Sequence, residues 1–131
     1  MATAQAHIDR SKYTMRMTAR THQFIADEPA ELNGSDLGPT PDELLCASLA
    51  ACTSATLRMY ADRKSWPLEE AVVTVKMSKS DDGKTTQLSR TLNLIGELTD
   101  DQKARLIDVA NKCPVHRTLT QPIHIETSFI H

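Results

Sequence analysis

Aromatic side chains are scarce in this sequence, at 4% of its 131 residues, although hydrophobic residues make up 40%. This scarcity excludes a core built around large rings, so aliphatic side chains must supply most of the buried surface. A chain of this length hides about two thirds of its surface on folding. We therefore expect one domain over residues 1–131 with a single aliphatic core.

An excess of basic charge is also missing. The formal net charge is -2, the isoelectric point is near 6.2, and Lys and Arg are scattered, which argues against nucleic-acid binding. Met1–His7 lacks the basic and apolar blocks of a signal peptide. The longest uncharged run, Leu44–Leu57, has 14 residues, fewer than the roughly 18 that cross a bilayer. We expect a cytoplasmic protein that binds neither nucleic acid nor a membrane.

The N-terminal third predicts two strands and a loop. Apolar residues alternate with polar ones over Tyr13–Ala19, which is typical of a half-buried strand, and a second strand is expected over His22–Ala26. The turn-forming pairs Asn33-Gly34 and Gly38-Pro39 then predict a loop over Asp27–Pro41.

A long helix follows this loop. Thr40 can cap it, Pro41 suits the first helical position, and Glu43 completes a Thr-x-x-Glu capping box. The helix should run to about Lys64 and end before Trp66-Pro67. Alternating residues next predict a hairpin, whose strands we list with its turn: Ala71–Met77, Asp82-Gly83 and Gln87–Ile95.

Two further helices and a strand complete the chain. Thr99 and Gln102 repeat the capping box and start a helix that ends near Asn111. A short helix over Pro114–Thr120 and a closing strand over Ile123–Phe129 follow. Strands thus precede, separate and follow three helices, which predicts an α+β fold.

The three cysteines are an odd number, which argues against a structural disulfide framework and leaves catalysis, redox sensing or simple burial. Cys113 precedes Pro114 at a helix start, where free N–H groups and the helix dipole favour a thiolate. Cys52 lies about twelve positions into the long helix, beyond the reach of the dipole, so an activating cation must come from elsewhere. Cys52 and Cys113 could each instead be an inert residue of the core, because Cys is often fully buried.

Cys46 and Cys52 lie about 9 Å apart along one helix and about 120° apart around it, so they cannot form a disulfide within that helix. Any internal disulfide must join Cys113 to one of them, and packing is the expected role of Cys46. Zinc binding by Cys113, His116 and His124 is disfavoured because the sequence lacks a second close-spaced ligand pair.

Several longer motifs resemble the OsmC/Ohr family (osmotically inducible protein C and organic hydroperoxide resistance protein). The residues are similar to the central helix and the second-cysteine motif of its OsmC-like branch, and they occur in the family's order. They are Gly38–Leu45, Ala47–Thr53, Leu57–Ala61, Asn111–Leu119, and also His22 and Ala26–Pro29.

The resemblance implies an OsmC-like α+β fold in which a long central helix is buried on an antiparallel sheet of an intertwined homodimer. It also implies a thiol peroxidase. The Cys52 thiolate attacks an organic hydroperoxide and becomes a sulfenic acid, Cys113 forms a disulfide with it, and an external dithiol reduces the pair. No cofactor or metal is implied.

In better known members of the family an arginine and a carboxylate support the thiolate. By position these would be Arg20, with Arg16 as the second choice, and Asp42, where hydroperoxide reductases carry a glutamate. Glu43 and His116 are further candidates for support. Asp42 lies about 15 Å from Cys52 along a straight helix, so an Asp42–Arg20 pair is expected to act across the dimer interface.

A second reading stays open: a dimeric redox-sensing or ligand-binding protein with little turnover. Asp42 and the Cys-Pro-Val-His form of the second motif both favour it. An aliphatic pocket around Cys52 would instead favour fatty or aromatic hydroperoxides as substrates.

Overall fold

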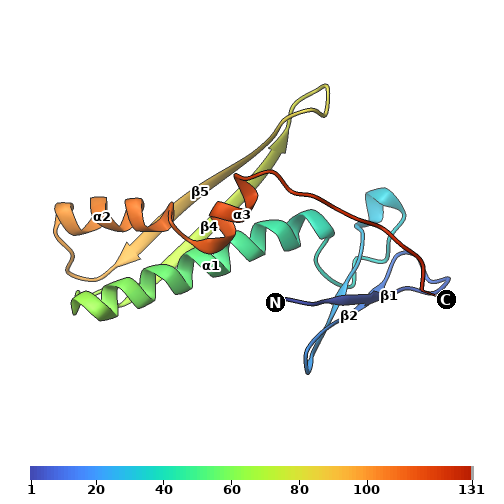
Figure 1. Cartoon of the computed structure of the whole chain (residues 1–131), viewed down its shortest axis with the longest axis horizontal. Helices are drawn as coiled ribbons and strands as arrows, with labels where there is room; N and C mark the ends of the chain where they lie inside the picture. The colour runs from blue at the N-terminus through green and yellow to red at the C-terminus, as the bar shows by residue number, and fades with distance from the viewer. Residues whose placement is uncertain (131) are drawn as a thin grey trace. The chain divides into compact units, whose positions relative to one another are not determined.

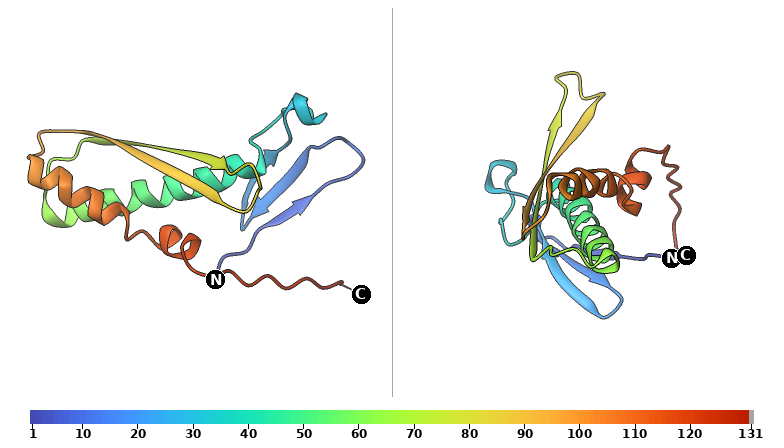
Figure 2. Two further views of the ribbon diagram at one scale, coloured as in Figure 1. Left: turned by 90° about the horizontal axis from the view of Figure 1, so that it is seen from above. Right: turned by 90° about the vertical axis from the view of Figure 1, so that its left-hand side faces the viewer.

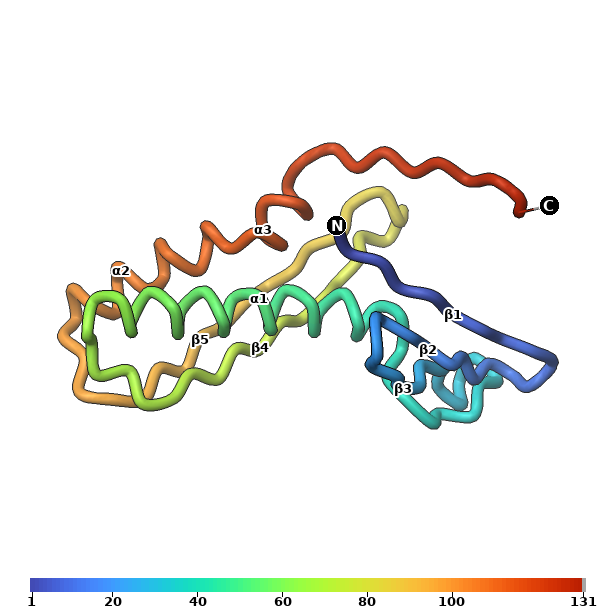
Figure 3. Tube along the Cα trace, turned by 60° about the horizontal axis from the view of Figure 1, so that its bottom comes forward, coloured from blue at the N-terminus to red at the C-terminus, as the bar shows by residue number. Residues whose placement is uncertain are grey.

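The computed structural model describes residues 1–130, which form two compact units, one over Met1–Leu45 and one that begins at Cys46. The first unit is an antiparallel sheet in the order β1-β2-β3 (Figure 3), and it also contains one short 3-10 helix. Its elements are β1 (Gln5–His7), β2 (Met15–Ala19), β3 (His22–Ala26) and η1 (Ala30–Leu32).

A buried carboxylate organises the loop of this unit. Asp27 is fully buried and its two oxygens accept five hydrogen bonds of 2.8–3.3 Å, from the backbone of Tyr13, Glu28, Ser35 and Leu37 and from the Thr14 hydroxyl. Burial by itself raises the pKa of this carboxyl, but the bonds from Thr14, Glu28, Leu37 and Tyr13 outweigh it and lower the pKa to about 2. The loop therefore depends on an ionised Asp27.

The second unit is built on a two-stranded hairpin covered by helices on one face (Figures 1 and 2). Its elements are α1 (Pro41–Lys64), whose first residues up to Leu45 belong to the first unit, β4 (Glu70–Lys79), β5 (Thr86–Ile95), α2 (Asp100–Ala110) and α3 (Pro114–Leu119). Antiparallel pairing aligns Val73 with Leu92 and Val75 with Arg90. Because side chains alternate along a strand, Leu88, Arg90 and Leu92 share the covered face.

The core of this unit is aliphatic. One stripe of α1, at intervals of four residues, is buried, and Leu57 and Ala61 from it pack with Leu106 and Val109 of α2. Spacing of four keeps side chains on one side of a helix. Elsewhere α1 is open in this chain, and Met59 is 69% exposed. By length and composition α1 could also cross a membrane, a test that core helices of soluble proteins equally pass.

Most predicted elements are confirmed. The capping box of α1 is formed, with Thr40 N donating to Glu43 Oε1 at 2.8 Å and Glu43 N to Thr40 Oγ1 at 3.1 Å, and α2 begins with the same motif at Thr99. The strand β1 was not predicted, because its three residues carry no clear alternation.

The closing strand predicted over Ile123–Phe129 is wrong for the described chain, where this segment has no regular secondary structure and belongs to neither sheet. Its alternating residues stay outside, with Ile125 at 81% and Phe129 at 91% exposure. Alternation predicts the extended form, but a strand also needs a neighbour that supplies hydrogen bonds.

Candidate functional site

Two cysteine sulfurs meet at the first turn of α3. Cys113 Sγ accepts a hydrogen bond from His116 N at 3.3 Å, and Cys52 Sγ accepts one from Val115 N at 3.5 Å. The Cys52 side chain is also among the hydrogen-bonding groups that lower the pKa of Cys113, and both thiols are free. Cys113 is fully buried, whereas Cys52 is half-buried. Residues 61 positions apart in sequence thus form one thiol pair.

The start of α3 follows from its first residues. Cys113 has extended backbone (φ -66°, ψ 146°), and its sulfur occupies the N-cap, while Pro114 fills the first helical position, where no N–H is needed. The cap position predicted for Cys113 is confirmed.

Thr53 connects this sulfur to the rest of the unit. Its buried hydroxyl lies 3.7 Å from Cys113 Sγ, donates to Leu49 O at 2.7 Å, and accepts from Arg90 Nη1 at 3.0 Å. A hydroxyl has one proton to donate, so its bond to Leu49 competes with its bond to a Cys113 thiolate. Thr53 therefore holds Arg90 in place beside the sulfur.

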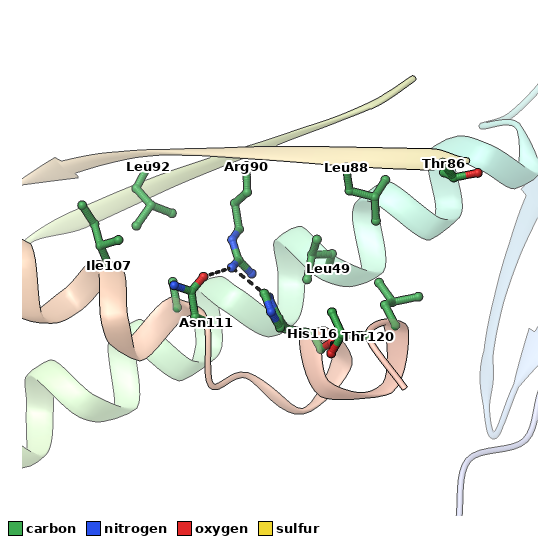
Figure 4. A pocket seen from close by; sticks show the side chains of 11 residues that line it. Leu49, Thr86, Leu88, Arg90, Leu92, Ile107, Asn111, His116 and Thr120 are labelled. Atoms are coloured by element: carbon green, nitrogen blue, oxygen red, sulfur yellow. Dashed lines mark hydrogen bonds between the residues drawn. The ribbon is translucent and has the colours of Figure 1, made fainter. Parts of the chain in front are cut away.

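Arg90 reaches inward from β5 and gathers three neutral partners. Besides Thr53, its Nη2 lies 2.8 Å from Asn111 Oδ1 and 3.0 Å from His116 Nδ1 (Figure 4). A guanidinium only donates, so His116 Nδ1 accepts and its ring proton lies on Nε2. Over residues 1–130 no carboxylate forms an ion pair with Arg90.

These contacts set the ionisation of Cys113. Burial raises the pKa of its thiol, but hydrogen bonds from His116 N, the Thr53 hydroxyl and the Cys52 thiol, together with the charge of Arg90, outweigh burial and lower the pKa. The sequence predicted the contribution of the helix start. Arg90 and Thr53 were not predicted.

A pocket of about 510 Å³ opens beside Arg90, between β5 and the helices (Figure 4). It is mainly aliphatic and neither thiol lines it. The lining residues are Leu49, Thr86, Leu88, Arg90, Leu92, Ile107, Ala110, Asn111, His116, Leu119 and Thr120.

The predicted site residues divide between the two units. Cys52, Cys113 and His116 come together in the second unit, as described above. Arg16, Arg20, Asp42 and Glu43 belong to the first: Arg16 Nη2 lies 2.9 Å from His7 Nδ1, Arg20 has a left-handed backbone (φ 55°) after β2, and Glu43 completes the capping box. Support of Cys52 by Arg20 and Asp42 therefore stays a prediction.

A signal for Arg90 was present in the sequence. Within Thr86–Ile95, Leu88, Leu92 and Leu94 alternate, and Arg90 is the one charged residue in that apolar phase. A charged side chain on the covered face of a strand needs polar partners. Such a position is therefore a candidate for a functional residue.

The other candidates remain apart from the thiol pair. Cys46 is half-buried on α1. His124 Nε2 lies 3.5 Å from Glu126 Oε1, with both side chains 86% exposed. Through residue 130, no three His, Cys, Asp or Glu side chains group as possible metal ligands.

Known proteins resemble this chain in sequence and in fold. The family model described as OsmC-like protein matches residues 34–128. The chain belongs to the OsmC-like family. No protein with a curated description matches its sequence.

Three solved structures illustrate the OsmC-like fold. An OsmC-like protein from Mycoplasma pneumoniae is 23% identical, with a TM-score of 0.79 over 91% of this chain and 86% of that one. An organic hydroperoxide resistance protein from Elizabethkingia anophelis, with thiocyanate bound, is 21% identical, with a TM-score of 0.72 over 92% and 88%. A protein from Vibrio cholerae with captopril in one of its active sites is 24% identical, with a TM-score of 0.67 over 92% and 84%.

Proposed function

We propose that this OsmC-like protein reduces organic hydroperoxides to alcohols, using Cys52 and Cys113 as a thiol pair. The observation that carries the proposal is that two free thiols accept hydrogen bonds from successive backbone N–H groups in the first turn of α3, and that one of them has a lowered pKa. Family membership and the structural similarity to proteins named for organic hydroperoxide resistance support it.

The first step is assigned to Cys52, because it is half-buried and Cys113 is fully buried. The Cys52 thiol first releases its proton, and the leaving alkoxide later takes up an equivalent proton. The Cys52 sulfur attacks the outer oxygen of the hydroperoxide, the O–O bond breaks, and the alkoxide leaves as an alcohol after taking a proton. Cys52 becomes a sulfenic acid.

The second step closes the pair. Cys113 attacks the sulfenic sulfur, an S–S bond forms, and water leaves with the hydroxyl and one proton. An external dithiol then exchanges with this disulfide, restores both thiols and is itself oxidised to a disulfide. Two electrons pass from the dithiol to the peroxide in each cycle, and no cofactor takes part.

Arg90 is assigned a positioning role in this scheme. It touches Thr53 and His116, which both contact Cys113, and its charge favours the Cys113 thiolate. Support of Cys52 by Arg20 and Asp42 across a dimer interface remains part of the proposal.

We also propose that the protein is a cytoplasmic homodimer that binds neither nucleic acid nor a membrane. Exposed apolar residues on α1 and on the C-terminal segment, Met59, Ile125 and Phe129 among them, support a second copy as the surface that covers them. Sedimentation should give twice the chain mass.

Steady-state turnover tests the function. Wild-type protein with dihydrolipoamide should consume cumene hydroperoxide repeatedly, Cys52→Ser should abolish turnover, and Cys113→Ser should stop it after one oxidation. Cys46→Ser is the matched control and should turn over normally. One equivalent of peroxide consumed by the wild type, with no further turnover, would instead indicate a redox sensor.

A further inference from the structure

Within residues 1–130, the charge of Arg90 has no carboxylate partner. Its three hydrogen-bond partners, Thr53, Asn111 and His116, are neutral, and no ion pair to it forms within residues 1–130. The side chain is only half-exposed. A partly desolvated cation without a counter-charge favours an anion beside it. Cys113 supplies part of that charge, but the hydroxyl of Thr53 lies between them.

The pocket beside Arg90 indicates what else such an anion should carry besides its charge. Aliphatic side chains from four elements form the pocket wall: Leu49, Leu88, Leu92, Ile107 and Leu119. Among the residues that the structure describes, no acidic side chain and no second Arg or Lys lines it. A volume of about 510 Å³ lies in the range of small-molecule sites, about 300–1,000 Å³.

We propose that this pocket binds an aliphatic monocarboxylate, with the carboxylate on Arg90 and the hydrocarbon chain along the leucines. A guanidinium has five N–H donors and three hydrogen bonds occupy Arg90, so donors remain for a carboxylate oxygen. The exposed Asn111 amide can add another. The single positive charge of Arg90 matches the single negative charge of a monocarboxylate.

The pocket adjoins the thiol pair and shares Arg90 and His116 with its surroundings, but neither cysteine lines it. The bound molecule is therefore a ligand that need not carry a peroxide group. Binding does not depend on turnover, so the proposal stands or falls separately from hydroperoxide reduction.

Calorimetric titration of the whole protein with sodium octanoate tests the site, with octanol as the uncharged ligand of equal chain length. Octanoate should bind the wild type at least about tenfold more tightly than octanol, since a hydrogen bond to a charged group favours the ion by that order. Arg90→Gln should weaken octanoate by a similar factor, and Arg90→Lys should restore part of it. Arg117→Gln, the same change at an exposed arginine outside the pocket, should bind like the wild type.

Equal affinity for octanoate and octanol, or unchanged affinity in Arg90→Gln, would overturn the proposal. If Arg90→Gln does not fold, nuclear Overhauser contacts in the wild type decide instead. Contacts from the octanoate chain to methyl groups of Leu88, Leu92 or Ile107 support the site, and contacts only to other methyl groups overturn it. A Cys52→Ser variant without peroxide turnover should still bind octanoate, which separates the two proposals.

Discussion

Arg90 and Cys113 are linked through a single hydroxyl group. The guanidinium nitrogen Nη1 lies 3.0 Å from Thr53 Oγ1, and that oxygen lies 3.7 Å from the Cys113 sulfur. The chain thus couples a strand residue to a helix cap through one buried threonine. The ionisation of the Cys113 thiol should therefore change when either Arg90 or Thr53 is replaced.

Replacement of Thr53 by Val removes the hydroxyl but keeps the branched shape. We expect the pKa of Cys113 to rise, because one hydrogen bond to the thiolate is lost and Arg90 loses an acceptor that positions it. The ultraviolet absorbance of the thiolate during a pH titration of Cys52→Ser/Thr53→Val measures this. Thr56→Val, which removes only a bond to Cys52 O, is the control; an equal shift in both variants would show that the effect is not specific to Thr53.

Replacement of Arg90 by Gln should also raise the pKa of Cys113 and move the pH profile of peroxide reduction to higher pH. The positive charge favours the thiolate, and a mutant without it needs a higher pH for the same ionisation. Arg90→Lys keeps the charge and should recover part of the shift. The rate at saturating alkaline pH separates this effect from a loss of folded protein, and an unmoved profile would contradict the role of Arg90.

Asp27 makes stability depend on pH at the acid end. Its pKa is 3.8 in an unstructured chain and about 2 here, so the stabilisation is fully present above about 3.8 and is lost as the pH falls toward about 2. Asp27→Asn should lower the melting temperature at neutral pH and weaken this acid dependence. Asp81→Asn, in the exposed hairpin turn, should change neither. Melting curves of the three proteins across acid pH provide the comparison, and identical curves would exclude an ionised Asp27 as the organiser of the loop.

Gly34 has no space for a side chain. A Cβ atom there would lie 2.0 Å from Glu28 O, so Gly34→Ala forces the backbone to move and should cost about 1–3 kcal/mol or more. Gly83→Ala is the contrasting variant, because nothing lies within 4 Å of its Cβ and only the positive φ of 71° opposes it, at about 1 kcal/mol. Urea unfolding should rank Gly34→Ala as the less stable, and the reverse order would contradict the packing of the loop.

Local signals were read correctly from the sequence. The capping boxes at Thr40 and Thr99 and the cap at Cys113 each depend on residues within one helical turn, so their sequence spacing is sufficient. The long helix and the hairpin also follow from local patterns of apolar and polar residues, which a short stretch of sequence is enough to show.

Contacts between distant segments could not be read in this way. Arg90 meets Asn111 and His116 only after β5, α2 and α3 have packed, and the alternation of Ile123 and Ile125 does not say which strand will pair with it. The resemblance directed attention to Arg20, whose role stays a prediction, and it gave no indication of Arg90, which approaches Cys113 through Thr53. A lone charge in the apolar phase of a strand was the missed indication.

In the proposed cycle the sulfur of Cys113 has two tasks that cannot be performed together. As an N-cap it accepts the His116 N–H and holds the first turn of α3, but a disulfide to Cys52 would remove its charge and reorient the sulfur. Oxidation would then release the end of a six-residue helix. Amide hydrogen exchange at Val115 and His116 should accelerate in the oxidised protein, so that the disulfide itself opens the path by which a reductant reaches it.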